Sequence, residues 1–238
     1  MVISAREVFQ SDVAPVGVVS GSGIHLRPLL DRVIHEVSFP AAGLPAAGTS
    51  GHDGTFIFGW CGDAPIILQS GRIHLYEGHP PAVVASTVDA LHGFGVRSLV
   101  LTNAAGGLDE VLAPGDLVAA EAVLAWRFRA HPFPERLRPT FIVPGCVATG
   151  TYVWMHGPCY ETRAEIRALQ RMGGMAVGMS VLPELERCQA LGMRAGAVSC
   201  ITNDCTAQET LSHAQVVAVA EQASGELCGL LRGYLGAG

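Results

Sequence analysis

Residues 65–107 read PIILQSGRIHLYEGHPPAVVASTVDALHGFGVRSLVLTNAAGG, and this stretch decides the fold class. An apolar run at 65–72 predicts a strand, and residues 82–95 have helical spacing and end on glycine. Residues 97–107 then return to a strand that runs into a Gly-rich loop. Apolar strands that alternate with helices are typical of an α/β fold with a largely buried sheet.

The alternation continues on both sides of this stretch and covers most of the chain. Apolar runs that end in glycine or a polar turn predict further strands at residues 16–23, 115–124, 151–158, 175–180 and 194–203. Helical spacing predicts helices at residues 161–174, 181–192 and 213–234, the last with Ser212 as its N-cap. No repeat or linker interrupts the sequence, so we expect a single domain over residues 1–238.

The composition narrows the class of protein. Apolar residues make up 49% of the chain and charged residues only 15%, which indicates a compact globular protein. The net charge is −6 and no long basic run occurs, so we expect neither nucleic acid nor a membrane as a partner. The low charge favours an apolar subunit interface, with deep burial inside one chain as the alternative.

Lysine is absent, and all 15 basic residues are arginine. Enzymes that need a phosphate-loop, Schiff-base or cofactor-anchoring lysine are therefore excluded. The seven cysteines are odd in number and form no C-x-x-C pair, which favours buried thiols in a reducing compartment. Because charges also lie where a secretory signal would be apolar, we expect a cytoplasmic protein.

Five polar or Gly-rich stretches lie where predicted strands end, and these are the places where such folds gather functional groups. They are SGSGIH (20–25), SGHDG (50–54), SGRIHLYEGH (70–79), TNAAGG (102–107) and GPCYETR (157–163). Arg72 and His74 are two residues apart, so an extended backbone directs both to one face. An arginine fork beside glycines, with Ser22 and His52 as further donors, suits a phosphate ion.

Plainer interpretations of these stretches remain open at this stage. Arg72 and Glu77 could form a surface ion pair, and the glycines of 20–25 could make a simple tight turn. A metal site built on His74, Glu77 and His79 is disfavoured, because their spacing before two prolines is not helical. No G-x-S-x-G elbow follows a strand, which disfavours a serine hydrolase.

The order of these motifs resembles one family. GSGIH, GHDGTFIFG, GRIHLYEGH, TNAAGG, GTYVWMHGPCYET and AVGMSVLPE follow one another as in the trimeric-type purine nucleoside phosphorylases. The resemblance covers most of residues 15–235, and methylthioadenosine phosphorylases share several of the motifs. It implies a nucleoside-phosphorylase-like α/β domain with a central mixed β-sheet flanked by helices.

The resemblance also implies an activity. Members of the family cleave the N-glycosidic bond of purine nucleosides with inorganic phosphate, without a metal or organic cofactor, in purine salvage. The transition state resembles an oxocarbenium ion, so charge must be stabilised at the phosphate and at the departing base. A homotrimer, or a hexamer built as a dimer of trimers, is the implied assembly.

The resemblance assigns a role to each matching residue. The phosphate-binding residues are Ser22, His52, Arg72, His74, Ala104 and Ser180. Tyr76 and Met179 should contact the pentose, and His213 its 5′-hydroxyl, although a plain helix residue is the alternative for His213. The base should be held by Glu161 and Asn203 and lined by Tyr160 and Val177. Glu161, Asn203 and His74 are the implied catalytic residues.

Asn203 favours 6-oxopurine nucleosides such as inosine and guanosine, because the methylthioadenosine branch has aspartate there. A shift of one residue would place Asp204 at the base instead and favour methylthioadenosine or methylthioinosine. Glu161 could otherwise be a helix-start charge and Asn203 a turn residue. A nucleoside-binding pseudo-enzyme without turnover is a further alternative.

The chain departs from the family pattern in three places. His25 stands where the family has glycine, so its side chain could crowd the first loop or add a phosphate contact. Residues 126–150 are shortened, and either Phe128 or Phe133 could reach the sugar site of a neighbouring subunit. The spacing between Asn203 and His213 is also shorter than usual.

Overall fold

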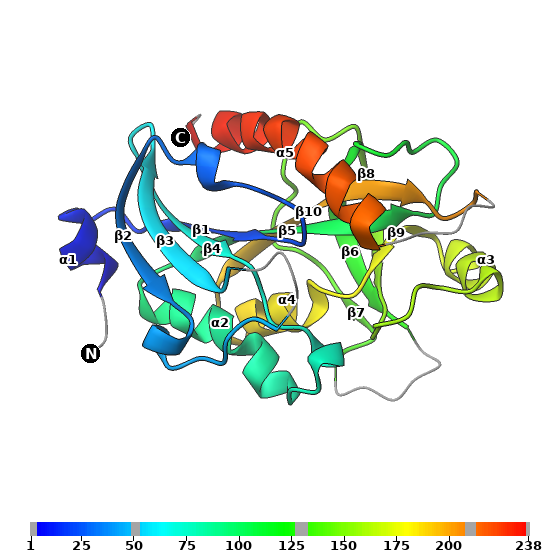
Figure 1. Cartoon of the computed structure of the whole chain (residues 1–238), viewed down its shortest axis with the longest axis horizontal. Helices are drawn as coiled ribbons and strands as arrows, with labels where there is room; N and C mark the ends of the chain where they lie inside the picture. The colour runs from blue at the N-terminus through cyan, green and yellow to red at the C-terminus, as the bar shows by residue number, and fades with distance from the viewer. Residues whose placement is uncertain (1–3, 49–52, 127–132, 208–212, 237–238) are drawn as a thin grey trace.

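A mixed sheet of ten strands organises the chain in the computed structural model, which describes residues 4–48, 53–126, 133–207 and 213–236 (Figure 1). The strand order is β10-β6-β8-β9-β5-β1-β4-β3-β2, with β7 paired to β6. The bounds are β1 Val16–Ser20, β2 Arg32–Ser38, β3 Thr55–Cys61, β4 Ala64–Ser70, β5 Ser98–Gly107, β6 Leu117–Ala125, β7 Arg136–Leu137, β8 Ala148–Trp154, β9 Gly174–Gly178 and β10 Arg194–Asp204.

The central strand β5 has parallel partners on both sides. It pairs with β1 from Ser98 to Leu101 and with β10 along most of its length. Its last residues, Gly106 and Gly107, pair with the antiparallel strand β9. Because β10 also pairs with β6, the strands β5, β9, β8, β6 and β10 close into a ring. The parallel strands β1, β4, β5 and β10 thus end on the same side of the sheet.

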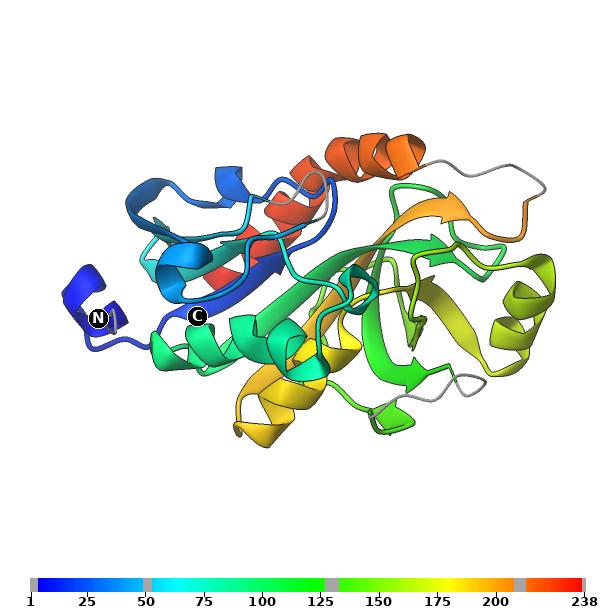
Figure 2. The same ribbon diagram turned by 60° about the horizontal axis from the view of Figure 1, so that its bottom comes forward.

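Helices cover both faces of this sheet. The helices are α1 Ala5–Phe9, α2 Pro81–Gly93, α3 Arg163–Arg171, α4 Leu182–Ala190 and α5 His213–Gly236, with the short turns η1 Arg27–Leu29, η2 Pro40–Ala42 and η3 Leu75–Glu77. In Figures 1 and 2, α2 and α4 lie on one face, α5 lies on the other, and α3 lies at one end of the molecule. This arrangement confirms the predicted α/β fold with a central mixed sheet flanked by helices.

Alternation along the strands divides the core between the two faces. On β4, Ile66 and Leu68 belong to the cluster under α5, whereas Ile67 belongs to the cluster under α2 and α4. Leu99 and Val100 of β5 divide in the same way, as the two-residue period of a strand requires. All of these side chains are almost fully buried, which stabilises the fold by about 1.5–3 kcal/mol for each one.

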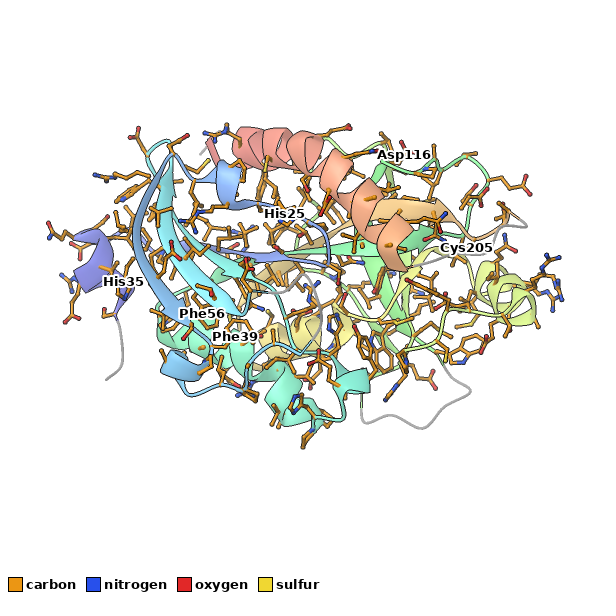
Figure 3. All side chains as sticks on the ribbon, in the orientation of Figure 1. His25, His35, Phe39, Phe56, Asp116 and Cys205 are labelled. Carbon is orange, nitrogen blue, oxygen red and sulfur yellow. The ribbon has the colours of Figure 1, made fainter. Side chains whose placement is uncertain are left out.

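Aromatic packing extends the core toward the β2–β3 edge. Phe39 and Phe56 lie ring against ring with centroids 5.0 Å apart (Figure 3), and Phe94 packs edge-on against Phe56 at 5.2 Å. The sequence analysis did not assign β2 or β3 as strands. Most of β2 is at least partly exposed, so its pattern lacks the apolar run of a buried strand.

Local chemistry sets the beginning of α3. Thr162 accepts a hydrogen bond from the backbone N–H of Glu165, and the Glu165 carboxylate accepts from the backbone N–H of Thr162 at 2.7 Å. This capping box ends the loop after β8 at a fixed residue and so defines the position of the preceding Tyr160 and Glu161. Within the described part of the chain, no helix is both long and apolar enough to cross a membrane.

Candidate active site

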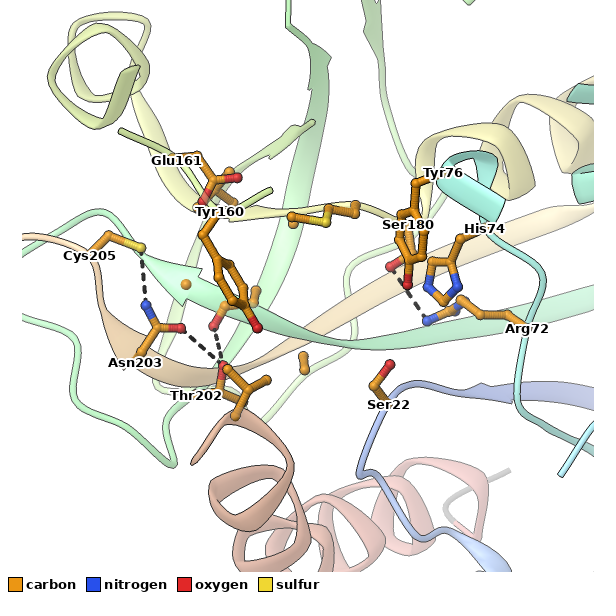
Figure 4. Close-up of a pocket in the computed structure, with 17 residues that line it drawn as sticks. Ser22, Arg72, His74, Tyr76, Tyr160, Glu161, Ser180, Thr202, Asn203 and Cys205 are labelled. Carbon is orange, nitrogen blue, oxygen red and sulfur yellow. Dashed lines mark hydrogen bonds between the residues drawn. The ribbon is translucent and has the colours of Figure 1, made fainter. Parts of the chain in front are cut away.

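One pocket lies where β1, β4, β5 and β10 end, and the loops after β8 and β9 complete it (Figure 4). It encloses about 660 Å³, part of which is open to solvent. It is lined by every predicted site residue whose side chain the structure describes: Ser22, Arg72, His74, Tyr76, Ala104, Tyr160, Glu161, Val177, Met179, Ser180 and Asn203. His52 and the side chain of His213 lie outside the described residues.

The pocket has two chemically different ends. In Figure 4, Arg72, His74, Ser180 and Ser22 lie at one end, and Glu161, Asn203 and Cys205 lie at the other. The first set can donate to an anion, and the second offers a carboxylate and an amide. Because both ends belong to one cavity, a single molecule can contact both.

Arg72 is the buried cation of the first end. Its side chain is 2% exposed, and its Nη1 donates to the carbonyl of Thr102 at 2.9 Å. Nε donates to Glu184 at 3.2 Å, and Nη1 also lies 3.5 Å from Ser180 Oγ. These contacts exclude the alternative that Arg72 forms a surface ion pair with Glu77.

His74 follows Arg72 on the same face, as the two-residue spacing predicts. Glu77 accepts from the backbone N–H of His74 at 2.8 Å and lies 3.2 Å from its Nδ1. The other carboxylate oxygen of Glu77 accepts from the backbone N–H of Gly48 at 3.0 Å. Burial lowers the pKa of His74, and the Glu77 contact opposes that shift.

The loop after β1 brings Ser22 to the same end, and its glycines allow the close approach. A Cβ on Gly21 would lie 2.8 Å from Cα of Asn103. Gly23 has φ +69°, and a Cβ there would lie 2.8 Å from the Val217 carbonyl of α5. The loop is therefore packed between β5 and α5, which fixes where Ser22 lies.

His25 does not line this pocket. Its backbone N–H donates to Ser224 Oγ at 3.0 Å, and its Nε2 lies 3.4 Å from Glu221 of α5 (Figure 3). The side chain is largely exposed. The side chain that departs from the family pattern at this position therefore lies outside the pocket that Ser22 lines.

Tyr76 and Met179 also line the pocket, and Tyr76 lies at the end that holds His74 (Figure 4). The Tyr76 ring stacks on His74 with centroids 4.7 Å apart. The loop after β8 packs closely on both side chains at Gly157, which has φ +73°, because a Cβ there would collide with Met179 Sδ and lie 2.9 Å from Tyr76 Cδ1. A flat aromatic face beside a thioether can bind an apolar face of a sugar ring.

Glu161 supplies the carboxylate at the end of the pocket opposite Arg72. Its Oε1 is buried and has no hydrogen-bond partner among the described residues. Burial raises the pKa of this carboxyl group, and the nearby charge of Glu165 adds to the shift. A buried acceptor without a partner is costly, so Glu161 Oε1 is a candidate acceptor for a donor group of a bound molecule.

Asn203 lies at the same end of the pocket as Glu161, and its amide has a partner on each side. Thr202 Oγ1 lies 3.2 Å from Asn203 Oδ1, and Asn203 Nδ2 donates to Cys205 Sγ at 3.3 Å. The next residue, Asp204, does not line this pocket but lines an adjoining cavity that it shares with Asn203 and Glu161. Its carboxylate accepts from the backbone N–H and the hydroxyl of Thr206. The side chain at this end of the pocket is therefore the amide.

The sequence analysis missed six residues of the pocket wall, which are Ala105, Gly106, Gly178, Thr202, Cys205 and Val216. Thr202 and Cys205 hold the amide of Asn203, Gly106 makes room for Cys205, and Val216 reaches the pocket from α5. The position of Thr202 directly before Asn203 on a predicted strand was a usable signal. Val216 lies three residues after His213 on the same predicted helix, so the helical spacing was a usable signal for it as well.

The described residues contain no group of three histidine, cysteine, aspartate or glutamate side chains placed to hold a metal ion. Of the two phenylalanines predicted to reach a neighbouring subunit, Phe128 lies outside the described residues. Phe133 packs edge-on against Trp154 of its own chain, with centroids 5.5 Å apart.

The sequence of residues 15–236 matches the phosphorylase superfamily, and the chain belongs to that family. Purine nucleoside phosphorylase 1 of Geobacillus stearothermophilus is 32% identical over 235 residues, which cover 87% of this chain and 85% of that protein. The purine nucleoside phosphorylase of Mycobacterium tuberculosis is 34% identical over 234 residues, with 91% and 87% covered. The family is one of enzymes, and these relatives carry the name of a pentosyltransferase.

A solved structure agrees with these relatives. A schistosoma purine nucleoside phosphorylase in complex with hypoxanthine is similar with a TM-score of 0.77 and 26% sequence identity. The likeness covers 96% of this chain and 93% of that one. It confirms the resemblance that the motifs predicted, over nearly the whole chain.

Proposed function

We propose that the chain catalyses the phosphorolysis of 6-oxopurine nucleosides such as inosine and guanosine. The products are the free base and ribose or deoxyribose 1-phosphate, and the pathway served is purine salvage. The observation that carries this proposal is that Arg72 and Glu161 line one pocket, with Asn203 at the same end as Glu161. The names of the relatives support the same activity.

In the proposed reaction, a phosphate oxygen held by Arg72, His74, Ser180 and Ser22 bonds to C1′ of the sugar. The C1′–N9 bond breaks, and its electron pair leaves with the purine. The proton that HPO₄²⁻ loses on becoming a phosphate ester balances the one that the leaving purine gains. Buried donors around the phosphate stabilise the charge that the transition state develops, because they are already oriented.

Recognition of the base rests on Glu161 and Asn203. Inosine and guanosine carry a hydrogen on N1, which the Glu161 carboxylate accepts, and Asn203 contacts the O6/N7 edge. Adenosine has an unprotonated N1, so two acceptors would face each other, which is unfavourable in a buried site. The engagement of Asp204 with Thr206 supports the assignment of the amide to the base. The hypoxanthine bound by the schistosoma relative is a 6-oxopurine.

The remaining assignments belong to the same proposal. Tyr76 and Met179 contact the pentose, and Tyr160 and Val177 line the base. His52 and His213 add a phosphate contact and a 5′-hydroxyl contact. Inorganic phosphate is the co-substrate, without a metal or organic cofactor, in a cytoplasmic homotrimer or a dimer of trimers. Either Phe128 or Phe133 reaches the sugar site of a neighbouring subunit.

A substrate panel with and without phosphate tests the proposal. Purified protein should release hypoxanthine from inosine and guanine from guanosine only when phosphate is present. Preference for methylthioadenosine or methylthioinosine would assign the chain to the related branch, and base release without phosphate would indicate a nucleosidase. Nucleoside binding without any release would indicate a pseudo-enzyme.

A further inference from the structure

Glu184 is a buried carboxylate that none of these reaction steps uses. It lies in the first turn of α4 and is 3% exposed. Its Oε1 accepts from Arg72 Nε at 3.2 Å, and its Oε2 accepts from the backbone N–H of Val181 at 3.0 Å. One oxygen therefore holds the arginine of the site, and the other holds the backbone that follows Ser180.

The contact with Arg72 fixes an orientation. A guanidinium group is planar, so partners on two of its nitrogens define both its plane and its rotation. Glu184 is the partner on Nε, and the Thr102 carbonyl is a partner on Nη1 at 2.9 Å. With the Glu184 contact removed, the guanidinium could turn about the remaining contacts.

The contact with Val181 supports the other wall of the site. Val181 has φ +73°, a backbone conformation that is unfavourable for a β-branched residue. The Glu184 bond to its N–H helps to hold this turn, and the Tyr152 hydroxyl lies 3.3 Å from the backbone nitrogen of Ser180. Glu184 thus connects the turn that carries Ser180 to the loop that carries Arg72.

The negative charge of Glu184 opposes the effect that its contacts have on phosphate binding. A carboxylate near a phosphate site repels the anion, so its charge alone weakens phosphate binding. A neutral residue could cap α4 without that repulsion. Loss of the charge and loss of the orientation therefore have opposite effects on phosphate affinity, and an experiment can separate them.

We propose that Glu184 is a positioning residue for inorganic phosphate, which acts by holding Arg72 and the Ser180 turn in one geometry. This inference rests on the proposed function and deepens it. Glu184 itself does not touch the phosphate. Its effect on the anion runs through the guanidinium and outweighs its own repulsion.

The test compares wild type, Glu184→Gln and the matched control Glu186→Gln on the same helix. A glutamine has one acceptor oxygen, so it cannot serve both Arg72 and Val181. In Glu184→Gln, the KM for phosphate and the calorimetric Kd of inorganic phosphate should both rise at least about tenfold. The KM for inosine at saturating phosphate should stay within about twofold, and Glu186→Gln should match wild type. An unchanged or lower KM for phosphate overturns the proposal.

A double-mutant cycle tests whether the effect runs through Arg72. In an Arg72→Met background, Glu184→Gln removes a carboxylate that has lost its partner, so phosphate binding should strengthen. Equal weakening in both backgrounds contradicts the proposal. If Glu184→Gln does not fold, Glu184→Asp is the second variant, because aspartate keeps the charge but is too short to make both contacts. An unchanged Kd for phosphate in Glu184→Asp would also contradict the proposal.

These results are distinguishable from failure of the proposed function. A wild-type protein that releases no base with phosphate refutes the phosphorylase activity. The calorimetric Kd needs no turnover, so the role of Glu184 in phosphate binding is measured separately.

Discussion

The side chains of Asn203 and Asp204, consecutive at the end of β10, have different partners, and only Asn203 lines the pocket that also holds Arg72. The Asn203 amide lines the pocket between Thr202 Oγ1 and Cys205 Sγ, whereas the Asp204 carboxylate accepts from Thr206 at 2.7 Å. A shift of one residue would put an anion beside Glu161. The observed register leaves a neutral amide there, on which the proposed base preference depends.

Asn203→Asp should therefore shift the preference toward 6-aminopurines. The introduced carboxylate accepts from the exocyclic amine of adenosine and repels O6 of inosine. We expect the ratio of kcat/KM for inosine to that for adenosine to fall by about 100-fold, a change typical of a reversed hydrogen bond in a buried site. An unchanged ratio would count against the contact between Asn203 and the base edge. Asp204→Asn, whose carboxylate does not line this pocket, is the matched control and should leave the ratio unchanged.

Glu161→Ala should abolish most turnover of 6-oxopurines while the fold is retained. The substitution removes the acceptor for N1–H, and we expect kcat/KM for inosine to fall by about 100- to 1000-fold. Steady-state kinetics measure the loss of kcat/KM, and circular dichroism checks that the variant is folded. Glu226→Ala, at an exposed position on α5, is the control for loss of a carboxylate. Full activity in Glu161→Ala would refute the assigned role.

The pH dependence of activity should report the burial of Glu161. Burial raises the pKa of its carboxyl group above the ordinary value of 4.5 because desolvation disfavours the anion. The ionised form is the one that accepts from N1–H, so activity is present above the raised pKa and is lost as the pH falls through it. We expect the acid limb of kcat/KM for inosine to lie above 4.5 and to disappear in Glu161→Gln. An acid limb of the wild-type kcat/KM profile at or below the ordinary glutamate pKa would contradict this account.

Gly23→Ala should destabilise the protein more than Gly43→Ala. Both glycines have positive φ, +69° and +82°, so both substitutions carry the same backbone strain of about 1–2 kcal/mol. A Cβ on Gly23 also meets the Val217 backbone at 2.8 Å, whereas nothing lies within 4 Å of a Cβ on Gly43. In thermal unfolding, the Tm of Gly43→Ala should fall by a few degrees, at roughly 2–4 °C per kcal/mol of lost stability. The Tm of Gly23→Ala should fall further. Only Gly23→Ala should raise the KM for phosphate, and equal effects on both properties would argue against close packing of this loop on α5.

Residues close to a strand end could be placed from the sequence, and the reason is topological. Parallel strands carry their carboxyl ends to one side of a sheet, so Ser22, Arg72 and Asn203 had to lie on one side once their strands were assigned. The two-residue spacing of Arg72 and His74 then gave a common face. The family motifs supplied Glu161, whose loop is fixed by the capping box at Thr162.

Features that depend on long-range contacts could not be predicted in this way. Glu184 has the sequence of an ordinary helix-start carboxylate, and only its approach to Arg72, 112 residues earlier, makes it part of the site. The sequence left open whether Asn203 or Asp204 serves the base, and the contacts that distinguish the two side chains appear only in the fold. The strand β2 was missed because it lies at the sheet edge, where exposed side chains hide the apolar pattern of a strand.

The account depends most on a single cavity in which phosphate and purine meet across one sugar. Phosphorus NMR of a mixture of protein, inosine and inorganic phosphate measures this outcome directly. A ribose 1-phosphate resonance should grow in step with hypoxanthine, one for one, while inorganic phosphate declines equally. Free ribose in place of the sugar phosphate, or hypoxanthine release without loss of inorganic phosphate, would contradict it.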